Sequence, residues 1–131
     1  MSGGEFALST SKRLEFIDIT DRLGKAIAVP GRRDALCFVF NPHTTAGLTI
    51  NEGADPAVRA DILAVLPRII PRDYPYEHLE GNSPAHLMAS LMGSSVTVIV
   101  EQGRLRLGTW QKIYFCEFDG PRTRKLFWRL T

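Results

Sequence analysis

The chain has 131 residues, of which 44% are hydrophobic and 23% are charged, and its formal net charge is +2. These values are typical of one soluble globular domain over residues 1–131 and exclude an intrinsically disordered chain. The small charge argues against a nucleic-acid partner. No run approaches the roughly 18–20 apolar residues that span a bilayer, so no membrane partner is expected. The N-terminus lacks the basic and apolar regions of a secretory signal, so the sequence predicts a cytoplasmic location.

The first predicted elements are a strand and a short helix. Leu14–Ile19 is a mainly apolar run of strand length. Thr20 follows it as a candidate N-cap, because a threonine hydroxyl can accept a hydrogen bond from the first helical turn. Pro30-Gly31 then breaks the chain. The helix between these points would carry its apolar residues at helical spacing, at Leu23, Ala26 and Ile27.

Two apolar strands are predicted next. Ala35–Phe40 is continuously apolar, which is typical of a strand buried on both faces, and Leu48–Ile50 forms another. Cys37 lies in the first of these strands, and Cys116 lies in a later aromatic run. A free cysteine in such a position behaves as a small hydrophobic residue, so burial is predicted rather than a disulfide.

Two longer helices are each marked by a capping residue followed by proline. Asp55-Pro56 opens the first, and Pro67 and Pro71 end or kink it. Residues 72–80 are predicted to be a polar loop, after which Ser83-Pro84 opens the second helix. The apolar positions are Val58, Ile62, Leu63 and Leu66 in the first helix and Leu87, Leu91 and Met92 in the second.

The last third of the chain is predicted to consist of strands. Val96–Glu101 and Arg104–Leu107 flank Gln102-Gly103, a pair suited to a tight hairpin turn. Thr109–Phe118 and Arg124–Leu130 follow as longer strands. Antiparallel strands with two to three inserted helices predict an α+β fold in which two mainly antiparallel sheets pack on each other.

The three histidines of the chain are His43, His78 and His86, and all lie among turn-forming residues or at a helix start. Imidazole is the commonest protein metal ligand and a proton shuttle near neutral pH. Three imidazoles with an open fourth position are one arrangement for catalytic zinc. The histidine spacings match no compact metal motif, so ordinary packed or surface histidines remain the alternative.

Several polar and aromatic residues are candidates to complete a site. No structural role explains a glutamate at position 52, at the end of its strand. Glu52 is therefore the candidate general base or partner of a histidine. Asn51 and Asn82 could orient a substrate or satisfy a turn. Arg122 is either an anion contact or a solvated turn residue. Trp110-Gln111 is either core or interface, or the wall and polar edge of a pocket for a heterocycle.

Taken together, the motifs make the chain resemble the YjbQ-like family, small proteins of uncharacterised function. The resemblance covers nearly the whole sequence, although Lys112 stands where the family pattern has glycine. The segments that carry it are His43–Glu52, Asp55-Pro56, His78 with Glu80–Asn82 and His86, Ser90–Ser95, Leu107–Gln111 and Asp119–Arg122.

The resemblance implies a homotrimer and a cleft near a subunit boundary in which the three histidines hold a divalent metal. Zinc is the expected ion, with magnesium an alternative for a pyrophosphate substrate. It also implies a secondary thiamine-phosphate synthase activity, which joins a pyrimidine pyrophosphate to a thiazole phosphate and releases pyrophosphate. The expected roles are acid/base catalysis for Glu52 with Asn51, and substrate contacts for Asn82, Trp110, Gln111 and Arg122.

Two functions therefore stay open at the level of sequence. The first is a metal-dependent enzyme, a transferase or a hydrolase, that acts on a small phosphorylated or heterocyclic substrate. The second is a non-enzymatic trimeric protein that binds a metal or a metabolite without turnover. An exchangeable water on the metal would favour the enzyme.

Overall fold

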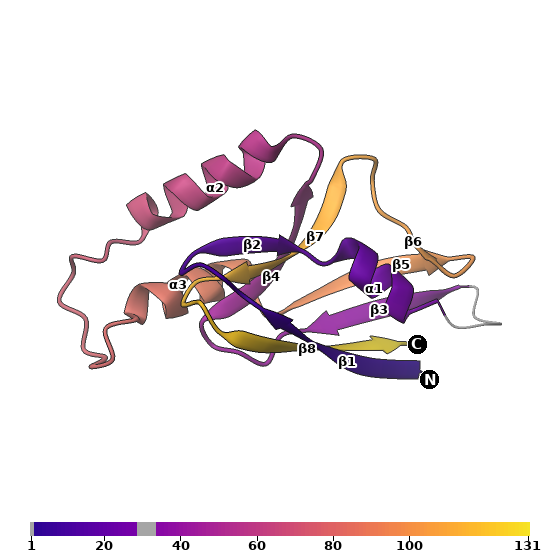
Figure 1. Ribbon diagram of the computed structural model, residues 1–131, viewed down its shortest axis with the longest axis horizontal. Coiled ribbons are helices and arrows are strands. Elements are labelled where there is room, and N and C mark those ends of the chain that lie inside the picture. Colours follow the sequence, from indigo (N-terminus) through magenta and orange to yellow (C-terminus); the bar gives the residue numbers. More distant parts are fainter. Residues whose placement is uncertain (1, 29–33) are drawn as a thin grey trace.

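A computed structural model describes residues 2–28 and 34–131, so the break predicted at Pro30-Gly31 lies outside the described residues. Within those ranges the chain forms eight strands and three helices (Figure 1). Their bounds are β1 Ser2–Ser9, β2 Glu15–Asp18, α1 Thr20–Ala26, β3 Ala35–Phe40, β4 Ala46–Glu52, α2 Pro56–Ile69, α3 Ser83–Met92, β5 Ser95–Glu101, β6 Arg104–Leu105, β7 Gln111–Glu117 and β8 Thr123–Leu130.

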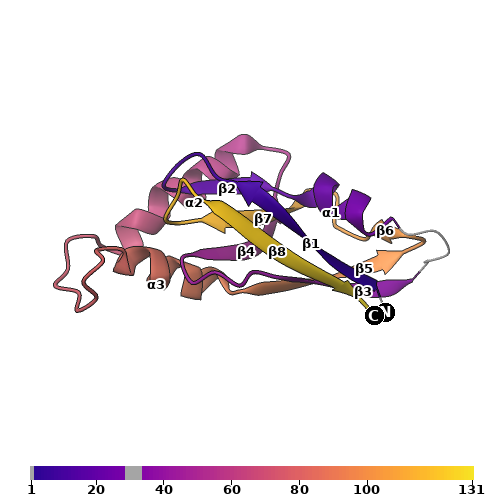
Figure 2. The same ribbon diagram turned by 60° about the horizontal axis from the view of Figure 1, so that its bottom comes forward.

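The strands form two antiparallel sheets. One sheet has the order β1-β8-β3-β5-β6 and the other has the order β2-β7-β4. Because β1 pairs with β8 from Ser2↔Leu130 onward, the two chain termini lie side by side (Figure 2). They lie at the end of the molecule away from α3. The predicted α+β fold with two antiparallel sheets is confirmed.

The central strand β7 explains why the molecule has two cores. Successive side chains of a strand point to opposite faces. Ile113 and Phe115 therefore enter a core between the two sheets, to which α1 also contributes. Tyr114 and Cys116 enter a second core, in which α2 and α3 cover the outer face of the three-stranded sheet. A strand buried on both faces is what the aromatic-rich sequence of this segment favours.

One strand was missed, and one prediction about a strand is wrong. The strand β1 was not predicted, because its sequence begins with glycines and has few apolar residues, and only its pairing with β8 makes it a strand. The strand β3 is not buried on both faces in this chain. Cys37 and Val39 are fully buried, whereas Phe38 and Phe40 are 45% and 49% exposed. The unbroken apolar run instead supplies an apolar outer face.

The predicted N-cap of α2 is confirmed, and the predicted N-cap of α1 is wrong. Asp55 caps α2 as predicted, and its Oδ1 accepts a hydrogen bond from the Ala57 N–H at 2.9 Å. Pro67 lies inside α2, which continues to Ile69 before Pro71 follows its C-cap. Thr20 is not a cap: its hydroxyl accepts the Ile113 N–H at 2.8 Å and so ties α1 to β7.

The second proline signature also marks a helix, but the capping position is one residue earlier than predicted. The N-cap of α3 is Asn82, and Ser83 is the first helical residue. The side chain of Asn82 makes no capping hydrogen bond, and its amide nitrogen donates to Asp119 Oδ2. Within residues 2–28 and 34–131, no helix is long and apolar enough to cross a membrane.

The tight hairpin between β5 and β6 is confirmed. Gln102 and Gly103 have φ angles of 51° and 77°, and the strands pair on either side of them at Glu101↔Arg104. The two cysteines are free and buried, as predicted. Burial raises the pKa of the Cys37 thiol to about 11 and raises that of Cys116 as well, so both stay protonated near neutral pH.

Candidate functional site

The candidate site is a polar cleft of about 370 Å³ at the end of the molecule where α3 begins. Turns that follow β3 and β7, the segment before α3 and the first turn of α3 all contribute to it. The cleft brings together all three histidines and two of the predicted substrate contacts. Its side chains include His43, His78, His86, Asn82 and Arg122, together with Thr45, Glu80, Asp119 and Arg124.

Asn41 fixes the turn that carries His43. This asparagine is 1% exposed, and its Oδ1 accepts the His43 N–H at 3.0 Å. Its amide donates to the Ala46 carbonyl at 2.7 Å. A buried amide with these partners holds the turn in one conformation. Sequence reasoning did not single out Asn41 for this role, although an asparagine before a proline is a turn signal.

The imidazole of His43 is held by the backbone of β8. Its Nε2 lies 2.9 Å from the Lys125 nitrogen, whose N–H donates to it, and 3.2 Å from the Lys125 carbonyl oxygen. Burial, together with the nearby positive charge of Arg124, lowers the pKa of His43 below 6.5. His43 is therefore neutral at pH 7, with Nε2 as an acceptor.

The other two histidines lie against each other. The ring centroids of His78 and His86 are 5.2 Å apart, and the rings meet edge to face at 84°. His86 comes from the first turn of α3, and His78 comes from the exposed segment between α2 and α3. Two imidazoles at this separation can share one ligand, either a metal ion or an anionic oxygen.

Beneath the cleft lies an ion pair between Glu117 on β7 and Arg124 on β8, which sequence reasoning missed. Glu117 is fully buried and Arg124 is 5% exposed. The arginine Nε donates to Glu117 Oε1 at 2.7 Å, its Nη2 pairs with Oε2, and Nη2 also donates to the Thr45 hydroxyl at 2.9 Å. Both residues occupy inward positions of facing strands, at the edge of the core between the sheets.

Further hydrogen bonds keep Glu117 ionised. Burial alone would raise the pKa of its carboxyl group, but hydrogen bonds from Arg124, from the Asp119 N–H at 3.0 Å and from the Thr10 hydroxyl at 2.8 Å outweigh burial. The pKa of Glu117 therefore lies below its ordinary value of 4.5. A charged residue inside the aromatic run 114–118 is a signal that could have identified this group from the sequence.

Three polar residues form a chain along the rim of the cleft. Asp119 Oδ2 accepts hydrogen bonds from the Asn82 amide and from the Arg122 guanidinium, each at 2.9 Å. This fixes Arg122, whose Nε also donates to the Asp119 carbonyl oxygen at 2.7 Å. The Asn82 Oδ1 atom is buried without a hydrogen-bond partner among the described residues. It can accept a hydrogen bond from a donor on a bound molecule.

Four of the predicted site residues lie elsewhere. Glu52 ends β4, and Thr45 precedes this strand at the cleft, so Glu52 lies about 20 Å from the cleft along β4. Asn51 neighbours it, and Gln111 pairs with it across the sheet. Trp110 is 61% exposed beside them. The geometry of one chain thus gives these four residues no contact with the histidines.

Local contacts also explain three of those four residues. The carboxylate of Glu52 accepts the Asp55 N–H at 3.3 Å, and Asn51 Oδ1 accepts the Glu52 N–H at 2.7 Å. Gln111 Oε1 accepts the Gly108 N–H at 2.9 Å. Lys112 stands at the position where the family pattern has glycine, and its side chain packs against Gly53. A Cβ added to Gly53 would lie 2.0 Å from the Cγ of Lys112.

Comparison with known proteins agrees with the sequence motifs. The family model described as "UPF0047 protein YjbQ-like" matches residues 4–131. The chain belongs to this family. The UPF0047 protein YugU of Bacillus subtilis is 49% identical over 121 residues, covering 92% of each chain. A UPF0047 protein of Methanocaldococcus jannaschii is 47% identical over 123 residues, covering 94% of this chain and 89% of that protein.

Solved structures of similar proteins have the same fold. The crystal structure of an uncharacterised YjbQ/UPF0047 protein from Clostridium acetobutylicum is 55% identical, with a TM-score of 0.93 over 97% of this chain and 98% of that one. A hypothetical protein from Aeropyrum pernix is 35% identical, with a TM-score of 0.93 over 100% and 98% of the two chains. The family is of unknown function, so the chemistry has to be argued from the cleft.

The cleft contains side chains that could bind a metal ion, but they are not arranged as a complete coordination shell. Among the described residues, no three histidine, cysteine, aspartate or glutamate side chains are arranged to hold a metal. His78 and His86 are adjacent, but Nε2 of His43 accepts the Lys125 N–H. For Nδ1 of His43 to bind a metal, the proton would have to sit on Nε2 and be donated to the Lys125 carbonyl oxygen.

Gly120 lies in the turn between β7 and β8, where no side chain fits. A Cβ at this position would lie 2.3 Å from the Lys12 carbonyl oxygen and 2.8 Å from both Glu117 Cγ and Thr10 Oγ1. We expect Gly120→Ala to lower the free energy of unfolding by about 1–3 kcal/mol, because backbone has to move to relieve the contact. Urea denaturation measures this. Gly24→Ala is the control in α1, since its Cβ would meet only Leu105 Cδ1 at 4.0 Å.

Proposed function

We propose that this protein is an enzyme that acts on a small phosphorylated, heterocyclic substrate in the histidine cleft. One observation carries the proposal: three imidazoles and two guanidinium groups converge on one cleft of about 370 Å³. Guanidinium groups bind phosphate oxygens through paired hydrogen bonds, and imidazole moves protons near neutral pH. This combination suits the transfer or hydrolysis of a phosphate or pyrophosphate group.

The roles of the residues follow from their surroundings. Arg122 is half-exposed at the rim and fixed by Asp119, so it is placed to bind a phosphate that enters from solvent. Arg124 lies deeper and is neutralised by Glu117, so its part is to shape the floor of the cleft. In the absence of a metal His78 and His86 would be the proton donors or acceptors, and Asn82 Oδ1 accepts a hydrogen bond from the substrate. A secondary thiamine-phosphate synthase-type reaction fits these groups.

A divalent metal, zinc before magnesium, is part of the proposal. His78 and His86 would hold it, and His43 would join them after its proton moves to Nε2. When bound, such an ion acts as a Lewis acid or lowers the pKa of a bound water. The roles of Glu52 and Asn51 as acid/base residues stay a prediction that requires a second copy of the chain to bring them to the cleft.

The test combines metal content with turnover. Protein purified without an affinity tag is analysed for metal, then incubated with a pyrimidine pyrophosphate and a thiazole phosphate, and the released pyrophosphate is measured. The expected result is about one zinc per subunit and a release that is lost in His86→Ala and Arg122→Gln. The absence of metal even after divalent ions are added would contradict the metal-dependent form. Metal without turnover on any phosphorylated heterocycle would favour the alternative: a trimeric metal- or metabolite-binding protein.

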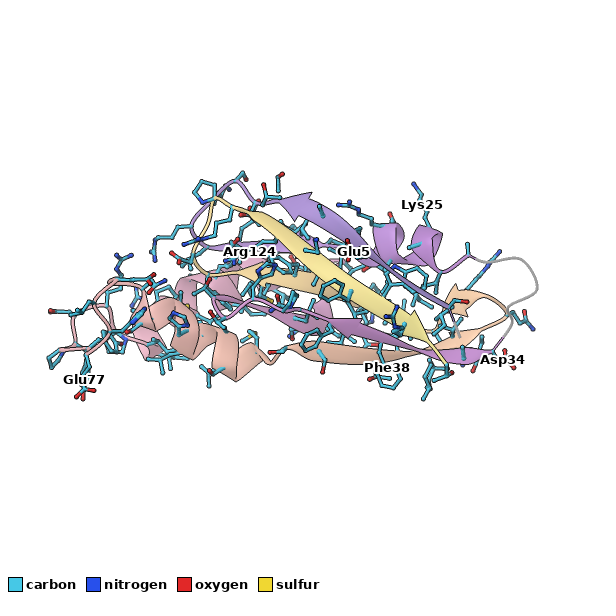
Figure 3. All side chains as sticks on the ribbon, turned by 90° about the horizontal axis from the view of Figure 1, so that it is seen from below. Glu5, Lys25, Asp34, Phe38, Glu77 and Arg124 are labelled. Atoms are coloured by element: carbon cyan, nitrogen blue, oxygen red, sulfur yellow. The ribbon has the colours of Figure 1, made fainter. Side chains whose placement is uncertain are left out.

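Self-association as a homotrimer is proposed from the apolar outer face of the five-stranded sheet. Phe38, Phe40 and Ile99 are 45%, 49% and 52% exposed on adjacent strands, and Leu36 is 40% exposed. Figure 3 shows Phe38 pointing away from the body of the molecule. A contiguous apolar patch of this kind is typical of an interface.

We expect Phe38→Glu to convert the oligomer to a monomer that stays folded, because the substitution places a charge in the patch but leaves both cores intact. Sedimentation velocity measures the mass, and circular dichroism checks the fold. Val65→Glu is the matched control, since Val65 is 49% exposed on α2, away from this face. A wild-type protein that sediments as a monomer would contradict the proposal.

A further inference from the structure

A second cavity opens directly beside the polar cleft. It has a volume of about 540 Å³, and the segment between α2 and α3 forms it together with the first turns of α3. His78 and His86 line both this groove and the polar cleft, so the two cavities are adjacent and share these side chains as a common wall. Figures 1 and 2 show this segment extending beyond the sheets at the end where α3 begins. The remaining residues of the groove are Tyr74, Tyr76, Ser83 and Leu87.

The lining of the groove is almost entirely apolar, although residues 72–80 read as a polar loop in the sequence. The ring centroids of Tyr74 and Tyr76 are 5.0 Å apart. The Tyr76 hydroxyl donates to the Pro71 carbonyl oxygen, and its N–H donates to the Tyr74 carbonyl oxygen at 2.8 Å. These bonds hold Tyr76 in place, and the ring of Tyr74 packs against it. Tyr74 and Leu87 are nevertheless 61% and 44% exposed, so apolar surface is available to a ligand.

We infer that this groove, here called the tyrosine groove, is the subsite for the aromatic ring of a substrate whose phosphate lies in the polar cleft. Aromatic rings pack favourably against one another and against aliphatic side chains. A charged phosphate, by contrast, needs the guanidinium and imidazole groups on the other side of His78 and His86. The ligand is thus a planar heterocycle joined by a short linker to a phosphate. The phosphate half of this inference rests on the proposed function, whereas the ring half does not.

The tyrosine groove, and not Trp110, is then the contact for the ring. Trp110 lies beside Gln111 at the start of β7, on the part of the sheet that holds Glu52 rather than the histidines. The tyrosine groove instead touches the two adjacent imidazoles directly. Tyr74, Tyr76 and Leu87 would therefore decide which rings are accepted.

The test compares three probes by NMR on protein with labelled leucine methyl groups: methyl phosphate, phenyl phosphate and benzyl alcohol. We expect phenyl phosphate to bind on the order of tenfold more tightly than methyl phosphate, because it adds a packed ring. Tyr74→Ala and Leu87→Ala should remove most of that preference without weakening methyl phosphate. Leu91→Ala is the control, because Leu91 is 60% exposed on the same helix but does not line the groove. Trp110→Ala should leave the preference unchanged.

Each outcome bears on the inference. Benzyl alcohol should shift the Leu87 methyl signals even without phosphate, and this would support the groove even if no phosphate bound and the proposed function failed. Equal affinity for phenyl and methyl phosphate would overturn the groove while leaving the phosphate-binding cleft intact. A ring preference that is lost in Trp110→Ala but kept in Tyr74→Ala would also overturn it, and would restore Trp110 as the ring contact.

Discussion

Replacing Glu117 with glutamine is expected to lower the free energy of unfolding by about 3–5 kcal/mol, because removing one charge of a buried pair leaves the other charge uncompensated. Arg124 is 5% exposed, and in the variant its guanidinium would face a neutral amide. The Thr10 hydroxyl and the Asp119 N–H would also lose their charged acceptor. Urea denaturation of the variant and the wild type measures the difference.

The ion pair between Glu101 and Arg106 supplies the matched control. It spans 3.2 Å, but both side chains are more than half exposed. Glu101→Gln should therefore cost less than about 1 kcal/mol. The double variant Glu117→Met/Arg124→Met should recover much of the loss, since replacing both charges leaves no buried ion. A loss below 1 kcal/mol in Glu117→Gln alone would show that the buried charge of Arg124 does not depend on Glu117 for compensation.

The same group gives the stability a defined pH dependence. The pKa of Glu117 is lower in the folded chain than its ordinary value of 4.5, so the unfolded chain takes up the proton first as the pH falls. The stabilisation is complete above pH 4.5 and is lost as the pH falls through the folded pKa. The free energy of unfolding of the wild type should thus fall below this pH more steeply than that of Glu117→Gln. Parallel curves would contradict the assignment.

Sequence signals identified the helices and turns whose conformation is determined by residues adjacent in the sequence. Asp55-Pro56 marks a helix because the cap and the proline act within one turn, and Gln102-Gly103 marks a hairpin because glycine readily adopts the positive φ that a tight turn requires. The strand β1 depends on β8, more than 110 residues away, so its own residues carry little signal. The exposure of Phe38 likewise depends on what covers the sheet and not on its neighbours in sequence.

The residues of the candidate site also divide into those that local sequence signals identify and those that depend on contacts distant in the sequence. The histidine cleft could be anticipated because His43, His78 and His86 lie in turns or at a helix start, where side chains are free to converge. The pairing of Glu117 with Arg124 was missed because only the packing of the two sheets brings these two charges together. Glu52 was placed at the site because no structural role was evident for it at the end of its strand, but β4 carries it to the opposite end of the sheet.

The histidines themselves are expected to contribute unequally to metal binding. His78→Ala and His86→Ala should each weaken zinc binding by at least about 100-fold, because removing even a partner of a ligand costs 10–100-fold. His43→Ala should cost less, since His43 must give up the hydrogen bond from the Lys125 N–H before it can bind the metal. The order of affinities therefore follows from hydrogen bonds already present in the chain.

Competition with a chromophoric chelator measures these affinities. Glu77→Gln is the control, because Glu77 neighbours His78 on the outer part of the same segment (Figure 3) and lines neither the cleft nor the tyrosine groove. The double variant His78→Ala/His86→Ala should lose less than the sum of the two single losses, because the two rings serve one ion. Equal losses in all three single variants would show that His43 binds the metal at no cost. Unchanged affinity in every variant would exclude the histidines as ligands and leave them as proton-transfer and phosphate contacts.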